Sequence, residues 1–359
     1  ISKRASGDTL IIGNGTYAER IWNGIPGGTS WSAPTTIKAQ NYLGAILQPT
    51  GNGRVINFDN DLGTTFKNQS YIVIDGLIID GINDSANATV AIEDGAHHIR
   101  IQNCEVKNAF ASGIGLWAGV LGGTHDNEVL NCKIHDNGRD TVTPNLDHGI
   151  YISTSNNLVK GNKIYNNQDF GVQIYHSGGT PADLAGNKII ENEIYSNSTY
   201  GNHAGIVAGG SGVLIANNIV RNNTGRGVLL QYTGGCDSCK IYNNTLYGNS
   251  LEGISIAIES DSSIIRNNSI FNNSAAISNS GIGTILSNNL TTDPKFVNPT
   301  TNDFHLQSTS PAINAGVTLA EVTTDYDGIT RPQGSAYDIG AYEYVSAVTP
   351  PPILSLSAS

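Results

Sequence analysis

The sequence predicts an all-β protein: a single-stranded right-handed parallel β-helix (solenoid) of about 10 coils, followed by a C-terminal capping segment. Three observations predict it. A motif of the form "VKGNKIYNN" recurs every 20–30 residues, and a second motif, Gly-Ile or Gly-Val followed by alternating apolar residues, lies between its copies. The chain also contains 42 glycines and only 14% charged residues. One such unit cannot bury its own apolar face, but units stacked end to end can.

The first motif supplies one position of a ladder along the solenoid. Its copies read "IQNCEVKN", "VLNCKIHDN", "VKGNKIYNN", "IIENEIYSN", "IANNIVRNN", "IYNNTLYGN" and "IRNNSIFNN", with "ILSNNL" as a shortened last copy. Strands of stacked coils lie about 4.8 Å apart, so amides at equivalent positions can hydrogen-bond from coil to coil. The predicted ladder residues are Cys104, Cys132, Asn162, Asn192, Asn218, Asn244, Asn268 and Asn288.

The second motif predicts a further strand in each coil. Its copies read "GIGLW" from 113, "GIYIS" from 149, "GVQIY" from 171, "GIVAG" from 205, "GVLLQ" from 227 and "GISIA" from 253. Apolar residues alternate in these segments, and turns with Asn or Gly separate them, which is typical of short strands. A β-propeller is the competing repeat fold, but its blades need longer periods of about 40–50 residues.

Composition and charge exclude several classes of function. The formal net charge is −11 and the pI is about 5.1, so the chain lacks the basic footprint of a nucleic-acid-binding protein. No apolar run approaches the roughly 18–20 residues that span a bilayer, so no transmembrane segment is expected.

Sequons at ten positions permit surface glycosylation: Asn14, Asn68, Asn83, Asn87, Asn197, Asn222, Asn243, Asn267, Asn272 and Asn289.

The repeat pattern ends before residue 293. The stretches "DPKFVNPTTNDFHLQSTSPAINAG" and "TDYDGITRPQGSAYDIGAYEY" are richer in Pro, Asp and Tyr. Through its "DIGAYEY" ending, this part resembles the C-terminal segment of bacterial and archaeal surface β-helix proteins called choice-of-anchor Q, which implies a secreted β-helix class. We therefore divide the chain into a β-helix (1–292), a segment capping the open end of the solenoid (293–345) and a Pro-rich linker or tail (346–359) leading to a further domain or partner.

The four cysteines are predicted to form two structural disulfides in an oxidising compartment. Cys104 and Cys132 take the ladder position in consecutive coils, and a bridge needs Cα atoms about 4.4–6.8 Å apart. Cys236 and Cys239 lie in the turn-rich "TGGCDSCKIY", without the helix of a redox motif or the two further ligands of a zinc site. Stacked free thiols at positions 104 and 132 are the alternative. Disulfides favour a secreted or cell-surface protein.

Outward-facing positions of the second motif define the candidate functional surface. Residues two and four after each Gly alternate with inward-facing apolar residues, and equivalent positions stack between coils. Aromatic rings stack on sugars while amides and acids meet their hydroxyls, so this surface suits an extended polysaccharide. The predicted substrate-binding residues are Trp117, Gln173, Tyr175, His176, Gln231 and Tyr232. The structural alternative is ordinary solvent-facing tyrosine, which strands favour.

Two insertions, 135–149 and 176–187, are expected to wall this surface, because loops on a rigid scaffold commonly carry function. Right-handed β-helices of this kind resemble polysaccharide lyases, hydrolases and C5-epimerases acting on uronate polymers. Lyase and epimerase chemistry removes the proton next to a carboxylate, and it needs a group that neutralises the carboxylate, a base and an acid.

On this resemblance, Arg226 neutralises the carboxylate, His148 is the base and Tyr151 is the acid, with Asp147 beside them. The "DHG" segment with Tyr151 is similar to the Asp-Pro-His plus Tyr arrangement of mannuronan C5-epimerases, although the proline is missing. The structural alternative for the Asp-His pair is a polar turn in which the Asp accepts backbone N–H bonds.

A cation, with Ca²⁺ as the cofactor considered, is the second way to neutralise a substrate carboxylate. Its predicted ligands are Asp140, Asp147 and Asp169. The segments "DNDLG" (59–63) and "TDYDG" (324–328) are further calcium candidates, although Asp-Gly turns give the same pattern. A hydrolase pairing the carboxylates of Asp147 and Asp169 is an alternative, provided that they lie about 5–9.5 Å apart.

The sequence thus favours a secreted β-helix that binds an extracellular polysaccharide and cleaves or epimerises it. The rival hypothesis is a non-catalytic cell-surface protein, such as an adhesin, sheath or filament subunit, that self-associates and uses the β-helix as a rigid rod. Activity on polysaccharides separates the two hypotheses.

Overall fold

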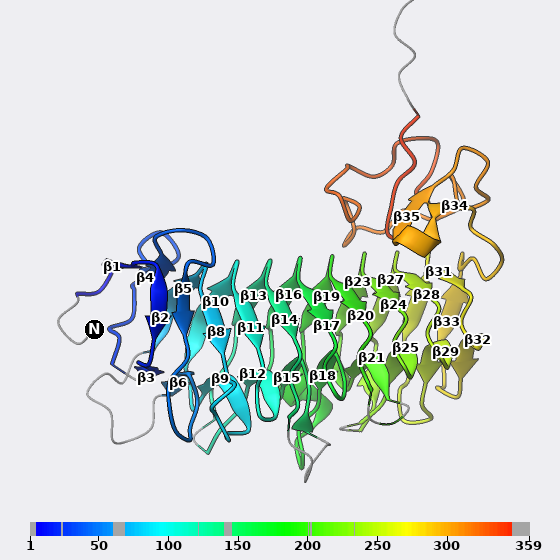
Figure 1. Ribbon diagram of the computed structural model, residues 1–359. Coiled ribbons are helices and arrows are strands. Elements are labelled where there is room, and N and C mark those ends of the chain that lie inside the picture. The colour runs from blue at the N-terminus through cyan, green and yellow to red at the C-terminus, as the bar shows by residue number, and fades with distance from the viewer. Residues whose placement is uncertain are drawn as a thin grey trace, which may run out of the picture.

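The computed structural model describes residues 5–22, 24–59, 69–120, 122–139, 146–199, 201, 203–232 and 234–346. Three long parallel sheets, which we call A, B and C, run along one solenoid (Figure 1). Successive strands of a sheet come from successive coils, so one coil contributes one strand to each sheet. This confirms the predicted right-handed parallel β-helix of about 10 coils, with sheets of 11, 10 and 10 strands among the described residues.

Sheet A consists of β1 (Thr9–Ile12), β4 (Thr35–Ala39), β7 (Ser70–Asp75), β10 (His97–Gln102), β13 (Glu128–Leu130), β16 (Leu158–Lys160), β19 (Lys188–Ile190), β23 (Leu214–Ala216), β27 (Lys240–Tyr242), β30 (Ile264–Arg266) and β33 (Ile285–Ser287). Sheet B consists of β2 (Gly15–Tyr17), β5 (Ala45–Leu47), β8 (Ile78–Asp80), β11 (Glu105–Lys107), β14 (Lys133–His135), β17 (Lys163–Tyr165), β20 (Glu193–Tyr195), β24 (Ile219–Arg221), β28 (Thr245–Tyr247) and β31 (Ser269–Phe271).

Sheet C consists of β3 (Ile21–Trp22), β6 (Ile56–Asp59), β9 (Ala88–Glu93), β12 (Ser112–Leu116), β15 (Ile150–Ile152), β18 (Val172–Ile174), β21 (Ala204–Ala208), β25 (Arg226–Leu230), β29 (Glu252–Ile256) and β32 (Ala275–Asn279). Outside the three sheets lie the pair β22 (Gly210–Ser211) and β26 (Cys236–Asp237), the antiparallel pair β34 (Phe296–Asn298) and β35 (Asp303–Leu306), and the 3-10 helices η2 (Pro181–Leu184) and η3 (Pro299–Thr301).

One contiguous apolar core fills the inside of the solenoid. The central residue of each short strand points inward, as Ile134, Ile164 and Ile194 do along sheet B, and all three are fully buried. Burial of one such side chain contributes about 1.5–3 kcal/mol. The period-2 pattern therefore fixes which residues face out, and outward residues of neighbouring coils stack in columns. No helix among the described residues is long and apolar enough to cross a membrane.

Asparagine ladders tie the coils together at the corners between sheets. In the predicted ladder the amide of Asn162 donates to Asn192 at 2.9 Å, and the series continues through Asn218, Asn244 and Asn268. Its last member is Asn289, not the predicted Asn288, because Asn268 donates to Asn289 at 2.9 Å. A second ladder and a third, shorter one, which the sequence analysis missed, run through Asn137, Asn167, Asn197, Asn223, Asn249 and Asn273 and through Asn127, Asn157 and Asn187.

Burial at the corners between sheets also removes three sequons from consideration as glycosylation sites. Asn197, Asn243 and Asn267 are fully buried, and their amides bond to neighbouring backbone or side chains. A buried amide cannot accept a glycan, so the sequon pattern at these positions arises from the repeat.

Only one of the two predicted disulfides is present. Cys236 and Cys239 are bridged, as predicted, with Cα atoms 5.6 Å apart. Cys104 and Cys132 are buried free thiols, so the prediction of a bridge between them was wrong. Each sulfur lies near a carbonyl of its own coil, that of Gln102 or Leu130, and the backbone N–H of Cys104 donates to the Cys132 sulfur at 3.4 Å. The Cys132 sulfur thus takes the place at which a ladder amide oxygen accepts the N–H of the preceding coil, without a bond to the Cys104 sulfur.

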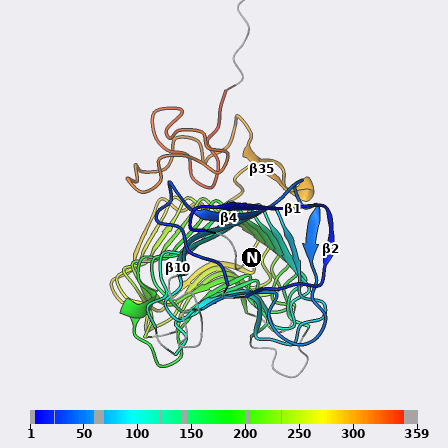
Figure 2. The ribbon, with the colours of Figure 1, turned by 90° about the vertical axis from the view of Figure 1, so that its left-hand side faces the viewer.

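The C-terminal segment lies on the flank of the solenoid rather than across its end, which corrects the predicted capping position (Figures 1 and 2). Its apolar residues, such as Phe304 and Tyr337, join clusters with outward residues of sheets A and B, such as Ile219 and Tyr242. Corner amides also bond it, as where Asn243 donates to the Asp338 carbonyl at 2.9 Å. Several coils are therefore clamped together by one segment.

Candidate functional site

Sheet C carries the predicted surface in the predicted register. Backbone pairing stacks the outward residues Gly115, Tyr151, Gln173, Val207, Leu229 and Ser255 in one column. Trp117, Ser153, Tyr175, Gly209 and Gln231 follow in a second column, since each donates its N–H to the preceding coil. The surface is less open than predicted, however: the predicted binding residues are half-buried, and Gln173 is buried.

A hollow of about 240 Å³ opens on this surface between the two predicted insertions. Its described walls include Trp117, Tyr151 and His176, together with Leu146 of the first insertion and Ser177 of the second. The Trp117 and Tyr151 rings meet edge to face, with centroids 6.2 Å apart. Burial, and to a lesser degree the neighbouring Tyr175, raises the pKa of Tyr151 to about 12. The Tyr151 hydroxyl is therefore protonated at neutral pH and available as a proton donor.

The sequence analysis missed an arginine that contacts the ring of Trp117, one of the residues lining this hollow. The Arg54 guanidinium is 5.2 Å from the centroid of the Trp117 ring and pairs with the Glu93 carboxylate. Arg54 precedes the first recognisable copy of the repeat, so no motif marked it. The sequence analysis expected Arg226 to neutralise the substrate carboxylate. Arg226 instead lies three strands away from Tyr151 along sheet C and pairs with Glu252 at 3.0 Å. The structure therefore does not bring Arg226 to the hollow.

Behind the hollow lies a buried network of acids and imidazoles. The Asp169 carboxylate accepts a hydrogen bond from His203 and lies 3.5 Å from Nδ1 of His148. Asp147 and His148 are fully buried and Asp169 is 1% exposed, whereas the His203 side chain is 34% exposed. The hydrogen bond to Asp169 raises the pKa of His203 above its ordinary value. His203 received no role from the sequence, although it follows Asp147 and Asp169 in the same repeat position.

Full burial changes the role available to His148. A general base must reach the proton that it abstracts, within about 3 Å or through one water. The His148 ring instead packs edge to face on Tyr151, with centroids 5.4 Å apart, and against Phe170 at 5.5 Å. The predicted direct base is therefore not accessible in this arrangement, and the ring supports Tyr151 from behind. Burial likewise keeps the carboxylates of Asp147 and Asp169 from reaching a substrate, so the predicted paired-carboxylate hydrolase has no accessible site in this arrangement.

The remaining predicted binding residues lie further along sheet C. Tyr175 and Tyr232 form an aromatic pair with centroids 5.3 Å apart, and Gln231, next to Tyr232 in the chain, follows two coils after Tyr175 in its column. Tyr232 also packs against Phe170, Val207 and Leu229, an apolar cluster that covers the outward face there. The predicted surface thus divides into a hollow at Trp117 and an apolar patch at Leu229.

The predicted metal ligands are not gathered into a site among the described residues. Asp140 lies outside these residues. The Asp169 carboxylate is already in contact with the imidazoles of His203 and His148, as described above. Asp325 of the "TDYDG" candidate accepts backbone N–H bonds from Asp327, Ile329 and Glu343, which is the behaviour of a turn aspartate. In the other candidate, positions 60–63 lie outside the described ranges.

Sheet B carries a second aromatic column, although the sequence analysis placed the aromatic cluster on one face. His135, Tyr165 and Tyr195 stack in register with centroids 4.6 and 4.9 Å apart, and Arg221 lies 4.0 Å from the Tyr195 ring. Burial and then Tyr195 raise the pKa of Tyr165 to about 12. This column is a regular cross-coil stack and supplies an internal control for the hollow.

The fold places this protein in the class of right-handed parallel β-helix proteins, and an aromatic hollow lies on its sheet C. The chain belongs to the family described as the right handed beta helix region, whose model matches residues 65–204 and 141–291. A comparison with curated proteins finds no match.

Solved structures resemble the chain in fold. The structure of pectate lyase Pel9A has 18% identity and a TM-score of 0.66, covering 95% of this chain and 89% of its own. The alginate lyase from Paenibacillus sp. str. FPU-7 has 16% identity and a TM-score of 0.57, covering 81% and 93%. The alginate lyase AlyGC of family PL6 has 15% identity and a TM-score of 0.56, covering 75% and 36%.

Proposed function

We propose that the protein is a secreted enzyme that binds an extracellular, uronate-containing polysaccharide in the sheet C hollow and acts on it as a lyase or C5-epimerase. The observation that carries this proposal is the convergence of Trp117, Tyr151 and His176 on one hollow between two insertions. A ring for stacking, a protonated phenol and an imidazole are the groups that proton abstraction next to a carboxylate requires.

The roles follow from the geometry. His176 takes the proton at the carbon next to the uronate carboxylate, and Arg54 neutralises the carboxylate as charge develops on it. In a lyase, the electron pair of the broken C–H bond forms a C=C bond, the glycosidic C–O bond breaks, and Tyr151 protonates the leaving oxygen. In an epimerase, Tyr151 returns a proton to the opposite face of the same carbon. The His148 ring packs against Tyr151 and positions it, and the contacts of Asp169 with His148 and His203 stabilise this arrangement.

Two further observations support this proposal. Structures named as pectate and alginate lyases share the fold over most of the chain, and the Cys236–Cys239 disulfide suits an oxidising, extracellular location.

The proposal is tested by incubating the protein with a panel of uronate and neutral polysaccharides. The readouts are ultraviolet absorbance of unsaturated products, new reducing ends, and incorporation of deuterium from heavy water into the recovered polymer. Activity on a uronate polymer is expected, and it should be lost in Tyr151→Phe but kept in Tyr165→Phe, a tyrosine with a similarly raised pKa on the opposite sheet. No product on any polymer would refute the enzymatic proposal.

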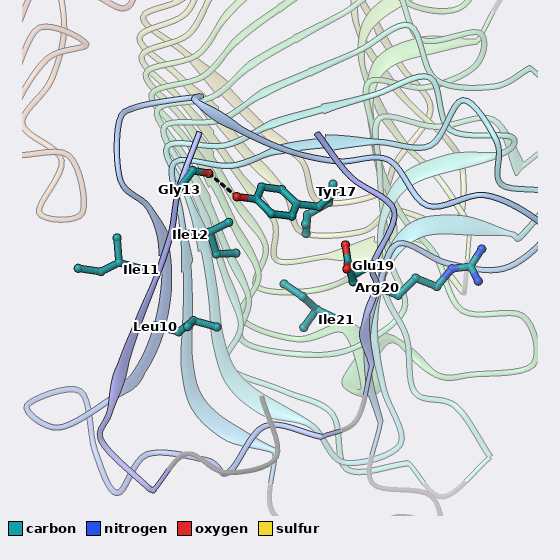
Figure 3. Close-up of a pocket in the computed structure, with 9 residues that line it drawn as sticks. Leu10, Ile11, Ile12, Gly13, Tyr17, Glu19, Arg20 and Ile21 are labelled. Atoms are coloured by element: carbon teal, nitrogen blue, oxygen red, sulfur yellow. Dashed lines mark hydrogen bonds between the residues drawn. The ribbon is translucent and has the colours of Figure 1, made fainter. Parts of the chain in front are cut away.

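A second candidate function, a self-associating structural rod, is favoured by the two ends of the solenoid. At the N-terminal end Leu10, Ile12 and Ile21 point into an apolar hollow of about 290 Å³ inside the first coil (Figure 3). At the other end Ile285 and Leu286 of the last sheet A strand are exposed. Among the described residues, β1 and β33 are the outermost strands of sheet A, and an unpaired strand edge is a template for pairing with another chain. Ordered filaments in electron micrographs, without activity on polysaccharides, would favour this candidate.

A further inference from the structure

A histidine-rich cluster stands at the corner that leads into sheet A, away from the proposed catalytic residues. His97 and His98 open β10, and His125 pairs with His97 by a parallel bridge in the next coil. The pairing makes Asp126 the stacked neighbour of His98. Both residues have positive φ, 54° in each case, so their side chains leave the corner in the same direction. The repeat therefore brings two imidazoles and a carboxylate, distant in sequence, to one spot.

The donor atoms of this cluster are close enough to share one ion. The ligating atoms of His98, His125 and Asp126 all lie within 4.8 Å of one another. The three residues are half-buried, so the spot is accessible to an ion. Zn²⁺ binds His nitrogen and Asp oxygen at about 2.0–2.2 Å, which places donors roughly 3–4 Å apart. Small side-chain rotations supply the remaining contraction.

Surrounding rings hold these ligands in place. The His97 ring stacks on His125 with centroids 4.9 Å apart and an interplanar angle of 5°, and its Nδ1 lies 2.7 Å from Nδ1 of His98. Tyr71 packs on the other side of His98 with centroids 4.6 Å apart. The Arg100 guanidinium lies over the Trp31 ring and pairs with Glu128 at 2.6 Å. His97 is therefore a positioning residue for the two imidazole ligands.

We propose that His98, His125 and Asp126 form a binding site for a divalent transition metal, with Zn²⁺ as its expected occupant. Two imidazoles and one carboxylate favour this class of ion over Ca²⁺ or Mg²⁺, which prefer all-oxygen sites. Three protein ligands leave a fourth tetrahedral position for water or a ligand. Two of the ligands, His125 and Asp126, line a hollow of about 590 Å³ that reaches Ser153 and His176. Those two residues also line the catalytic hollow, so the site adjoins the proposed polysaccharide path.

The chain contains two matched controls. His135 and Asp136 repeat the His-Asp pair of the site, with Nδ1 and Oδ2 2.6 Å apart, but Lys107 and Asn108 of the preceding coil take the places of His97 and His98. His305 contacts both Asp303 and Asp327, at 2.7 and 2.9 Å, in the C-terminal segment. Among the described residues, neither His135 nor His305 belongs to a group of three potential ligands like the one at His98.

The experiment is titration of the chelator-treated whole chain with ZnCl₂ by calorimetry. We expect one tight site per chain. The variants His98→Asn and Asp126→Asn suit the test because asparagine tolerates positive φ; together with His125→Ala, each should lower the affinity by at least about 10²-fold. The control variants His135→Ala and His305→Ala should leave the affinity unchanged. Substitution by Co²⁺ should give visible absorption bands that disappear in His98→Asn and persist in His135→Ala.

The proposal is overturned if the wild-type chain shows no saturable Zn²⁺ binding. It is equally overturned if His305→Ala removes the binding while His98→Asn keeps it. Circular dichroism of each variant establishes that the fold is retained, and a folded Asp126→Asn variant tests the site should His98→Asn not fold. Because the readout is metal binding, the result does not depend on whether the protein acts on polysaccharides.

Discussion

Sheets B and C both carry aromatic columns, yet they differ in how the rings are arranged. On sheet B the rings of His135, Tyr165 and Tyr195 stack almost parallel, with interplanar angles of 6° and 7°. On sheet C the rings of Trp117 and Tyr151 stand at 75°, and a hollow opens beside them. Parallel stacking covers ring faces within the protein, whereas an edge-to-face arrangement beside a hollow leaves a face for a ligand.

The difference has its origin in the repeat. The sheet B column follows three strands of equal length that pair in register, so the same position recurs undisturbed on this sheet. The sheet C column lies between two insertions, and acids and imidazoles are buried behind it. Aromatic content therefore does not distinguish a site from a structural stack in a solenoid. Interruption of the repeat, together with buried charged groups, is the better indicator.

The largest difference between the two columns is expected in catalysis. Tyr151→Phe should lower the rate on the active polysaccharide by about 10²–10⁴-fold, because it removes the proton donor. Tyr165→Phe should leave the rate unchanged, although the pKa of both tyrosines is raised to about 12. Initial rates of product formation measure both variants. Equal rates for Tyr151→Phe and wild type would remove Tyr151 from the mechanism.

The buried network predicts a large and pH-dependent effect on stability. Asp169→Asn should lower the free energy of unfolding by about 2–3 kcal/mol, because it removes a charged carboxylate that accepts a hydrogen bond from His203 and lies 3.5 Å from His148. Asp136→Asn, beside His135 on sheet B, should cost less than about 1 kcal/mol, since Asp136 is 51% exposed. Chemical denaturation measures both costs.

The sign of the pH dependence follows from His203. Its pKa is raised in the folded protein, so the protonated ring stabilises the fold. This contribution is fully present below the ordinary pKa of about 6.5 and is lost as pH rises through the raised pKa. The cost of Asp169→Asn should therefore be larger at about pH 6 than at about pH 9. A cost that is larger at the higher pH would contradict the assignment.

A moderate difference is expected in binding. Trp117→Ala should raise the dissociation constant for an oligosaccharide about fivefold, because one stacking surface worth about 1 kcal/mol is removed. Tyr195→Ala on sheet B should leave it unchanged. Titration calorimetry with the inactive Tyr151→Phe background avoids turnover. A weaker affinity in Tyr195→Ala alone would move the binding site to sheet B.

The smallest expected effect concerns the ladder position in the coils before the hollow. Burial raises the pKa of the Cys132 thiol, so little thiolate forms. Cys104 and Cys132 should resist iodoacetamide in the folded protein and react after unfolding, while the bridged Cys236 and Cys239 should not react without a reductant. Mass spectrometry counts the labels. A disulfide between Cys104 and Cys132 would appear as no labelling in either state.

The fold and the outward columns could be predicted because both follow from periodicity. The alternation around each Gly-Ile motif placed Tyr151 and Gln173 in one column, and backbone pairing has them there. Burial could not be predicted, because Asp147 and His148 lie in an insertion that has no repeat to follow. Arg54 and the His98 cluster were missed because they lie at coils or corners that the recognised motifs do not include. The stacked cysteines were misjudged because sequence spacing gives proximity but not the direction of each sulfur.

The most direct test of the central claim is a crystal structure of the Tyr151→Phe variant with an oligosaccharide of the polymer on which the wild type acts. The account predicts a sugar ring stacked on Trp117, with its chain running past His176 along sheet C. An oligosaccharide bound along the His135, Tyr165 and Tyr195 stack of sheet B, with the sheet C hollow empty, would contradict it.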